Sequence, residues 1–454
     1  LAGGPEFLGA NEMTLRRETP LDAVVRGEGE SVLPRFIDVF RDRSGWGSIP
    51  GLCFLRDGVY QDGGWAEPVH PLDRIPSPYA DELAGYHKPF IHVETSRGCA
   101  NTCAFCTSGK GRGVRFVSST RIRTDLEVIR RHGARQVRLI DRTFNDPPGR
   151  AVELVRMFAR DFPELEFHLE IDPARLTPDF IDALRWARPG QMLLEVGVQT
   201  FREATLALLG RRGEVAAVRR GLADLAALKG IGLHVDLVAG LPGVDGADLM
   251  RDLNELIRWG PREIQVELLK VLPGTELDAR KTEWGILAAE DPPYEVLRTA
   301  TMTPGDLMRA QRLSRLVDWF YNVPAFQPLL RRGVMEDETT VGRLLDFLIG
   351  EGMVFHCPSL DNRYRLLNRF WSDSTPIRQA LQYDWLKRGY SPQRGIAPGV
   401  PWKADVPPDA VLCEGEPVER FHRVVQARLD REYFFVYSGG EGAARSATAI
   451  YARP

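Results

Sequence analysis

An α/β fold with six repeated strand and helix units is the architecture that this sequence predicts. Between residues 90 and 280, short β-branched or apolar runs alternate with longer amphipathic runs, which is typical of parallel sheets covered by helices. Polar residues also recur at or near the C-terminal ends of the expected strands, where parallel barrels carry their chemistry. We therefore expect a partial (β/α)6 barrel with other domains on either side.

The six expected strands are short runs with high β propensity. They are FIHVET (90–95), QVRLID (136–141), EFHLEI (166–171), MLLEVGV (192–198), LHVDLV (233–238) and IQVELL (264–269). The intervening helices have recognisable ends. One is expected from Ser119 to His132, closed by Gly133, and another is opened by Thr177 and Pro178, because threonine caps free amides and proline suits the first helical position.

Two smaller segments precede the barrel. A chain of 454 residues exceeds the size at which one core keeps growing, so two or three domains are expected. The sequences GGPEF and VVRGEGE predict that residues 1–32 are the end of an α/β domain. Residues 33–89 are expected to link it to the barrel (90–280), with a helix and a strand pair around GLCFLRDGVYQD. Because the chain starts at Leu1, we expect a piece of a longer protein.

Past residue 280 the pattern becomes mainly helical. Residues 281–395 are expected to form a helical domain, with helices opened by Thr303 and Pro304, by Thr339, and by Thr375 and Pro376. Residues 396–454 form an extension in which YFFVYS and SATAIYA predict a terminal β-hairpin.

Charge and composition narrow the function classes. The formal net charge is −3 with mixed signs, which gives no field for nucleic acid. No apolar run approaches the roughly 20 residues of a membrane span, and the first residues do not resemble a signal peptide. Six cysteines with local clustering are typical of cytosolic metal or catalytic sites, so a cytoplasmic protein without membrane or nucleic-acid partners is expected.

Three cysteines fall within eight residues, CANTCAFC. Cys99, Cys103 and Cys106 can turn three sulfurs toward one centre. Zinc would need a fourth ligand that does not follow nearby, and a redox pair would leave Cys99 unexplained. An iron–sulfur cluster held by three thiolates keeps one iron open for a further ligand. The iron–sulfur cluster is favoured, with zinc and unliganded thiols as alternatives. The other cysteines, Cys53, Cys357 and Cys413, are expected to be small packed residues.

The stretch ETSRGCANTCAFC (94–106) resembles the cluster motif of the radical S-adenosylmethionine (SAM) superfamily, including Phe105 before the third cysteine. Further stretches resemble the subgroup with an N-terminal cobalamin-binding-type domain and an uncharacterised C-terminal domain: DRTFN, GVQT, VDLVAGLPG, LLKVLPGTEL, PPYEVLRT and LVDWFYN. The resemblance implies a radical SAM partial barrel, with residues 1–32 as the remnant of the cobalamin-binding-type domain.

Site residues follow from this resemblance. Cys99, Cys103 and Cys106 are the expected ligands of a [4Fe–4S] cluster, and Phe105 belongs to the same cofactor site. Contacts to SAM are implied for strand-end and nearby residues. These are Asp141, Glu170, Gln199, Asp236 and Arg211, with Arg212 as an equal alternative to Arg211. Asp141 departs from the commoner Gly-Gly-Glu pattern of the family. No further catalytic residue stands out.

The activity implied by the resemblance is reductive cleavage of SAM to a 5′-deoxyadenosyl radical, with cobalamin-associated methyl transfer to a small molecule or peptide. Cobalamin is expected only with the missing N-terminal domain, and a flavodoxin- or ferredoxin-type donor is expected to supply electrons. Three alternatives remain: 3-amino-3-carboxypropyl transfer, tRNA modification, and a non-catalytic cluster-binding scaffold. The motifs do not identify the substrate.

Overall fold

The chain divides into two compact units, residues 1–311 and residues 312–454. The computed structural model describes residues 1–17, 20–79, 88–108, 113–353, 356–392, 396–402, 406–415, 423–437 and 446–453. Within these ranges, none of the helices combines the length and the apolar character that crossing a membrane requires.

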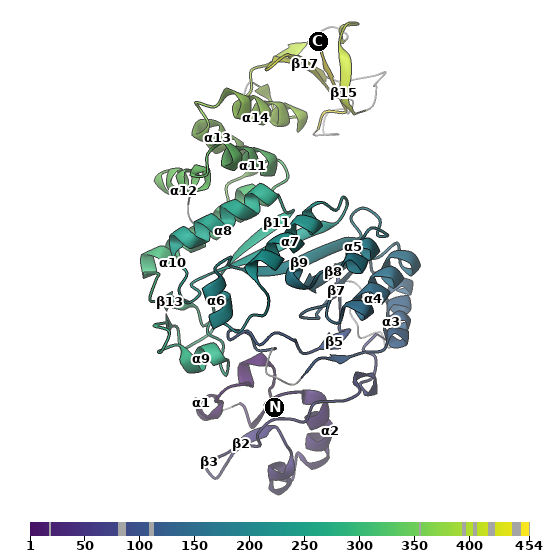
Figure 1. Ribbon diagram of the computed structural model, residues 1–454, viewed down its shortest axis with the longest axis vertical. Coiled ribbons are helices and arrows are strands. Elements are labelled where there is room, and N and C mark those ends of the chain that lie inside the picture. Colours follow the sequence, from purple (N-terminus) through teal and green to yellow (C-terminus); the bar gives the residue numbers. More distant parts are fainter. Residues whose placement is uncertain are drawn as a thin grey trace. The chain divides into compact units, whose positions relative to one another are not determined.

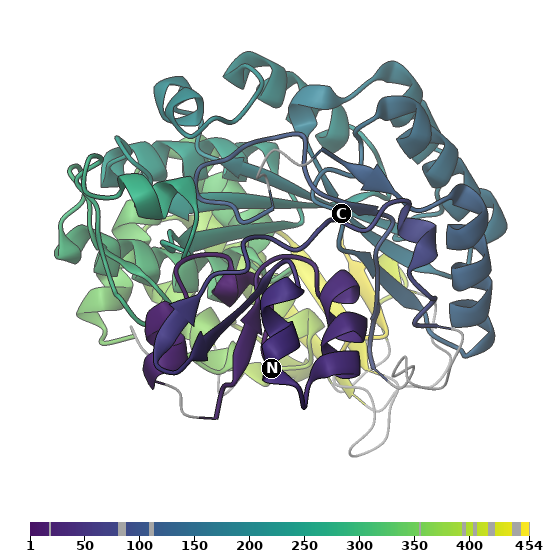
Figure 2. The ribbon, with the colours of Figure 1, turned by 90° about the horizontal axis from the view of Figure 1, so that it is seen from below.

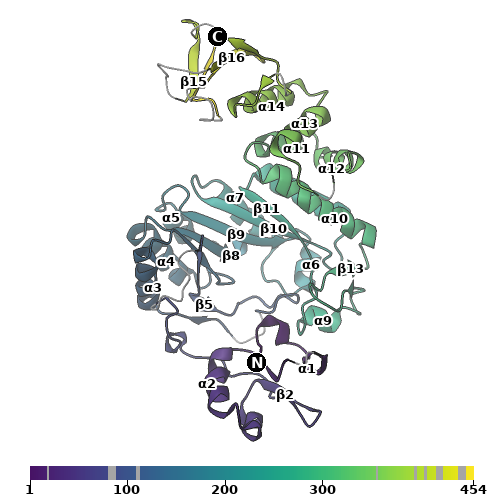
Figure 3. The ribbon, with the colours of Figure 1, turned by 180° about the vertical axis from the view of Figure 1, so that it is seen from behind.

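The first unit is built on the six-stranded parallel sheet that the sequence predicts (Figure 1). Its strands are β4 (Ile91–Val93), β7 (Gln136–Leu139), β8 (Glu166–Ile171), β9 (Met192–Gln199), β10 (Gly232–Ala239) and β11 (Glu263–Leu268). They follow the order β11-β10-β9-β8-β7-β4, with every neighbouring pair parallel. Figure 3 shows β8 to β11 side by side. This sequential order is that of an open partial barrel, so the predicted fold class is confirmed.

The two faces of this sheet differ in chemistry. In β8, Phe167, Leu169 and Ile171 are buried, whereas His168 and Glu170 alternate with them and are only half-buried. The helices that follow the strands are α3 (Ser119–Arg131), α4 (Pro148–Asp161), α5 (Pro178–Leu184), α6 (Glu203–Leu208), α7 (Val215–Ala226) and α8 (Gly246–Trp259). Figure 1 shows α3, α4 and α5 along one side of the sheet. The apolar face therefore packs on helices and the polar face lines the concave side.

Side-chain caps mark the starts of α3, α5 and α8, and the cap of α5 at Thr177 is the one that the sequence predicts. The Ser118 hydroxyl caps α3 by accepting from the Arg121 amide, and Thr177 caps α5 in the same way through Phe180. Asp245 and Asp248 form a capping box at the start of α8, and Gly260 ends that helix in the left-handed conformation.

The N-terminal segment forms a small sheet of its own. It contains α1 (Glu12–Arg17), β1 (Ala23–Val25), α2 (Gly29–Val39), β2 (Leu52–Arg56) and β3 (Val59–Gln61), with two short 3₁₀ helices at Pro5–Phe7 and Arg43–Ser48. Figure 2 looks at this segment from below. The strand pair predicted around GLCFLRDGVYQD is confirmed as β2 and β3.

The boundary predicted between residues 32 and 33 does not separate two structural units. Helix α2 runs across it, and β1 pairs antiparallel with β2. One apolar core joins both sides, since Val25 and Val32 pack with Trp46 and Phe54. The physical reason is that β1 needs a hydrogen-bonding partner, and β2 supplies it.

Residues 269–311 remain part of the first unit. They contain α9 (Glu276–Arg280), the short strands β12 (Leu287–Ala288) and β13 (Val296–Arg298), and the start of α10 (Pro304–Leu316). A bridge between Lys270 and Glu295 ties this stretch to the end of β11. The predicted start of this helix at Thr303 and Pro304 is confirmed by a capping box: Asp306 accepts from the Thr303 amide at 2.8 Å, and the Asp306 amide donates to the Thr303 hydroxyl at 3.2 Å.

The second unit is helical and then β-structured. A π-helical turn (Val317–Tyr321) continues α10, and α11 (Gln327–Glu336), α12 (Thr340–Gly350), α13 (Leu360–Phe370) and α14 (Thr375–Lys387) follow. The last residues form a five-stranded antiparallel sheet, order β14-β16-β17-β18-β15. Its strands are Val400–Trp402, Val411–Gly415, Arg423–Arg428, Glu432–Tyr437 and Ala449–Ala452 for β14 to β18.

The predicted terminal hairpin is part of this larger sheet. The two predicted strands do pair, as β17 and β18, while the GGEGAA turn between them lies outside the described residues. The expectation that the isolated cysteines are packed holds for Cys53, which is buried. It is wrong for Cys357 and Cys413, which are exposed.

The Phe158 side chain packs helix α4 against the sheet. It is fully buried in α4 and stacks on Phe167 of β8, with ring centroids 4.3 Å apart. Phe158→Ala is expected to lower the free energy of unfolding by about 3–5 kcal/mol, since it leaves a cavity against the apolar face. Urea denaturation followed by circular dichroism measures this. Trp186→Ala, at a side chain that is 63% exposed, is the control and should change little. Equal effects of both substitutions would contradict this account of the core.

Candidate functional site

The three clustered cysteines lie on a loop at the carboxyl end of β4. The loop leaves through β5 (Ser96–Arg97) and returns through β6 (Arg115–Phe116), which pair antiparallel as a two-stranded ribbon. Gly98 sits at the neck of the loop with φ +102°, and a Cβ there would lie 2.3 Å from the Gly113 carbonyl oxygen. Only glycine allows the two sides of the loop to approach this closely.

Backbone hydrogen bonds fix the middle of the loop to two distant segments. The Ala104 amide donates to the Leu209 carbonyl at 2.9 Å, and the Leu277 amide donates to the Ala104 carbonyl at 2.8 Å. The Cys106 amide donates to the Cys103 carbonyl at 2.9 Å, which turns the chain between these two thiols. The loop is thus held by residues after β9 and after β11, far apart in sequence.

Polar side chains after β7 and β8 hold the first cysteine. The Thr143 hydroxyl lies 3.3 Å from the Cys99 sulfur, and the Asn101 amide donates to that sulfur at 3.4 Å. The Asn101 side chain in turn donates to Asp172 at 3.2 Å, and the Asp172 amide donates to Asn145 at 2.8 Å. Within DRTFN, Thr143 contacts the Cys99 sulfur and Asn145 holds Asp172, which in turn accepts from Asn101 of the loop.

The three thiols are free and differ in burial, with Cys103 the most enclosed. Burial raises the pKa of the Cys103 thiol, the Arg211 guanidinium opposes that rise, and the neighbouring Cys106 and Cys99 add to it.

Asp141 does not lie where a ligand could reach it. Its side chain is fully buried and accepts three hydrogen bonds: from the Thr95 amide at 2.8 Å, the Thr95 hydroxyl at 2.5 Å and the Ser96 hydroxyl at 2.6 Å. Burial raises the pKa of the Asp141 carboxyl, and these donors oppose the rise. The prediction that Asp141 contacts SAM is therefore wrong. The carboxylate anchors the residues that enter the cysteine loop.

Glu170 and Asp236 lie together on the polar face of the sheet. Burial raises the pKa of the Glu170 carboxyl, Arg142 opposes this, and the nearby Glu195 and Asp236 reinforce it. Burial likewise raises the pKa of Asp236, whose carboxylate lies 3.1 Å from the His234 ring nitrogen. Glu170 and Asp236 are thus two half-buried carboxyl groups on the same side of the sheet.

A β-bulge places Gln199 and Arg211 over the same backbone segment. The register between β9 and β10 shifts after Asp236, so that Gly197 and Gln199 take successive partners, and Gln199 has φ +69°. A Cβ on Gly197 would lie 2.3 Å from the side-chain Nε2 atom of Gln199, and Arg211 donates to the Gly197 carbonyl. Arg212 is exposed. Arg211, which also acts on Cys103, is therefore the arginine that faces the site.

Phe105 is half-buried within the cysteine loop. Three residues that the motifs did not single out, His168, Glu195 and His234, lie on the same sheet face as Glu170 and Asp236. The sequence did carry a signal for them, because each occupies an alternate position of an otherwise apolar strand.

An ion-pair network joins the N-terminal segment to the cysteine loop. Glu28 pairs with Arg115 and, at 3.2 Å, with Arg97, while Glu30 pairs with Arg97 at 2.9 Å. Burial works against ionisation of Glu28, but hydrogen bonds from Arg115 and the Val69 amide lower its pKa overall.

Beside this network lies a cavity of about 560 Å³. Its lining includes Gly4, Gly27 and Gly29 of the N-terminal segment and Gly98 and Ser108 of the cysteine loop. No atoms lie within 4 Å of the positions where Cβ atoms of Gly4 and Gly29 would sit. The cavity thus has open space beside the backbone of Gly4 and Gly29 and borders the cysteine loop. This space could take a bulky ligand.

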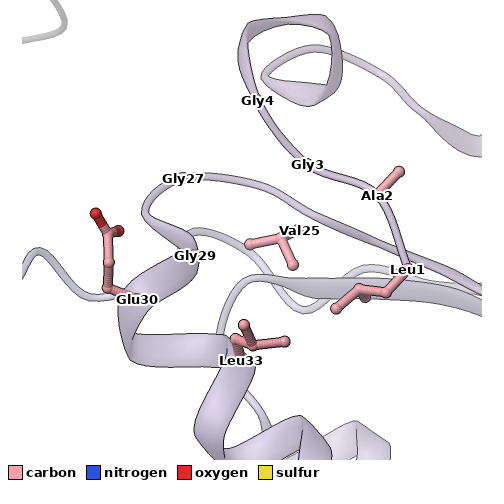
Figure 4. Close-up of a pocket in the computed structure, with 9 residues that line it drawn as sticks. All are labelled: Leu1, Ala2, Gly3, Gly4, Val25, Gly27, Gly29, Glu30 and Leu33. Atoms are coloured by element: carbon pink, nitrogen blue, oxygen red, sulfur yellow. The ribbon is translucent and has the colours of Figure 1, made fainter. Parts of the chain in front are cut away.

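A second hollow of about 390 Å³ has a different character (Figure 4). Leu1, Val25 and Leu33 point into it, and Glu30 is its one charged lining residue. It offers mainly apolar surface, and its one carboxylate already pairs with Arg97. The candidate site is therefore the region of the cysteine loop and the polar sheet face.

Comparison with known families agrees with this geometry. Residues 93–256 match the radical SAM superfamily. Residues 282–395 match a family described as a protein of unknown function (DUF4080), close to the helical domain predicted at 281–395.

Curated relatives include two methyltransferases. The chain is 33% identical over 164 residues to an uncharacterised methyltransferase of Pyrococcus horikoshii, covering 34% of this chain and 35% of that protein. It is 24% identical over 322 residues to the hopanoid C-3 methylase of Methylococcus capsulatus, covering 67% of this chain and 60% of the relative. The chain thus spans less than two thirds of either relative.

A solved structure shares the fold. The radical SAM methyltransferase TsrM of Kitasatospora setae, determined with cobalamin and a [4Fe–4S] cluster, aligns with a TM-score of 0.53 at 17% identity, covering 82% of this chain and 81% of that one. The cysteine loop, the parallel sheet and the family match all indicate the same superfamily. Residues 93–256 of this chain form a domain of the radical SAM superfamily.

Proposed function

We propose that this chain is the core of a radical SAM enzyme that transfers a methyl group to a small molecule or peptide, with cobalamin bound when an N-terminal cobalamin-binding domain is present. The observation that carries the proposal is the placement of Cys99, Cys103 and Cys106 on one anchored loop at the carboxyl end of the sheet, beside its polar face. The methyltransferases among the similar proteins support the reaction type.

The donor set fits a [4Fe–4S] cluster. The three thiols are free, Cys103 is buried, and Arg211 places a positive charge beside them. When bound, such a cluster supplies a low-potential electron and an open iron site for SAM. In this proposal a flavodoxin- or ferredoxin-type protein of the cytoplasm delivers the electron.

The chain's own residues would bind and orient SAM. Glu170, Asp236 and Gln199 offer carboxylate and amide groups for its ammonium and hydroxyl groups, and Arg211 offers a guanidinium for its carboxylate. Charge-assisted hydrogen bonds of this kind are strong where water is partly excluded, as it is on this half-buried face.

Cobalamin or the substrate would need a second space near the cluster. The cavity lined by Gly4, Gly27 and Gly29 opens beside Gly98 and Ser108 of the cysteine loop. We assign this cavity to cobalamin, because Gly4 and Gly29 leave open space beside the backbone for a large, flat ligand.

The chain is expected to cleave SAM once its cluster is reduced. Anaerobic reconstitution with iron and sulfide, followed by dithionite and SAM, should yield 5′-deoxyadenosine, measured by liquid chromatography with mass detection. A fully loaded cluster that yields methylthioadenosine instead would favour 3-amino-3-carboxypropyl transfer. A loaded cluster that leaves SAM intact would favour a non-catalytic scaffold, and both results contradict the proposal.

Replacing one cluster ligand should remove the cluster. Cys103→Ala is expected to abolish the visible absorbance of the reconstituted protein and the formation of 5′-deoxyadenosine, because two thiolates do not hold a cubane with an open iron. Cys357→Ala makes the same chemical change at an exposed thiol and should alter neither readout. Retained colour in Cys103→Ala would show that the ligand assignment is wrong.

Asp141 is expected to act as a positioning residue. Asp141→Ala leaves the donors of Thr95 and Ser96 unpaired in a buried place, at a cost of about 1–3 kcal/mol for each such group. We therefore expect fewer irons per chain, while the Kd for SAM of the cluster-loaded fraction stays unchanged. Asp224→Ala, an exposed site on α7, is the control. Normal iron content with a tenfold weaker SAM affinity would contradict this role and support a direct contact between Asp141 and SAM.

A further inference from the structure

Three strands of the sheet bring two histidines and a glutamate together. His168 lies on β8, Glu195 on β9 and His234 on β10, which are neighbours in the sheet. Glu195 pairs in register with His234 on one side and with Glu170, two residues beyond His168, on the other. The three side chains therefore project from the polar face within one small area.

The potential ligand atoms of these side chains are close. One ligand atom from each of His168, Glu195 and His234 falls within 4.8 Å of the other two. The His168 Nε2 atom lies 2.7 Å from a Glu195 oxygen, and the two imidazole centroids are 6.4 Å apart. The side chains are 17%, 27% and 9% exposed, in that order, so the cluster is largely removed from water.

Hydrogen bonds do not satisfy this cluster. The Nε2 atoms of His168 and His234 and the Oδ1 atom of Asp236 are buried without a hydrogen bond. Each nitrogen nevertheless lies within ion-pair distance of a carboxylate oxygen, at 2.7 Å for His168 and 3.1 Å for His234. The groups are thus near one another but not aligned as donor and acceptor. Buried polar atoms without partners are costly, and a shared cation would satisfy several of them at once.

We propose that His168, Glu195 and His234 bind a divalent transition-metal ion of the zinc type. Two histidines and one glutamate form a common ligand set for zinc, with metal–ligand distances of about 2.0–2.2 Å. Such distances place ligand atoms within about 4.4 Å of each other, so small side-chain rotations suffice from the observed spacing.

The site is distinct from the cysteine loop. It lies within the strands rather than beyond their ends, and its ligands are nitrogen and oxygen rather than sulfur. Three protein ligands leave open positions on the ion, which is typical of ions that bind water or a substrate atom. The inference does not depend on the proposed methyl transfer, because metal binding here needs neither the cluster nor SAM.

Zinc titration of a chain without cluster ligands tests the site. In a variant with Cys99, Cys103 and Cys106 all replaced by alanine, calorimetry should detect one equivalent of Zn²⁺. Glu195→Gln and His168→Gln, each added to this variant, should abolish that binding. His132→Gln, at an exposed histidine after α3, is the matched control and should leave binding unchanged.

Cobalt supplies a second readout in the same protein. Co²⁺ bound to nitrogen and oxygen should give weak visible bands without the strong bands of cobalt–thiolate bonds. The unmodified chain with its cluster loaded should bind the same equivalent of Zn²⁺, and circular dichroism should show which single variants remain folded. The proposal is overturned if the chain without Cys99, Cys103 and Cys106 binds no zinc, or if folded Glu195→Gln and His168→Gln bind it as the parent does.

Discussion

The difference between the two faces of the six-stranded sheet is the constraint on which the rest of the first unit depends. Parallel sheets are usually covered by apolar contacts on both faces. Here one face has Phe167 and Leu169 against helices, and the other has His168 and Glu170. A further layer of helices could not cover the second face without leaving these groups desolvated and unpaired. The sheet therefore stays open on that side, where ligands can supply partners.

The cysteine loop meets a related constraint in a different way. A loop that holds reactive thiols near a buried face must keep its shape without a core of its own. It does so by hydrogen bonds to three segments that follow strands of the sheet: Asp141 holds its entry, Asn101 ties it to Asp172, and Ala104 bonds to Leu209. The buried carboxylate of Asp141 is costly in itself, but its three donors repay much of that cost and fix the strand that leads to Cys99.

The sequence predicted the framework of this site better than its details. All six strands and the helix caps at Thr177 and Thr303 were predictable, because periodicity and capping are local properties. The role of Asp141 was not, since a carboxylate at a strand end looks the same whether it faces a ligand or a neighbouring strand. The bulge at Gly197 was also hidden, because register depends on β10 as well as β9. His168, Glu195 and His234 became a group only through strand order, although each was visible as a polar residue in an apolar strand.

Charge explains why the N-terminal segment and the cysteine loop act as one structure. Arg97 and Arg115 stand directly opposite each other in the ribbon that closes the loop. Like charges at such positions repel and would open the ribbon. Glu28 contacts both arginines, and its own charge is kept by their proximity. Glu94 and Glu30 also pair with Arg97, at 2.7 and 2.9 Å, but the carboxylate that bridges both strands of the ribbon is that of Glu28. Since that carboxylate belongs to the turn that also lines the large cavity, a ligand that moves Gly27 or Gly29 would alter the electrostatic balance at the neck of the cysteine loop.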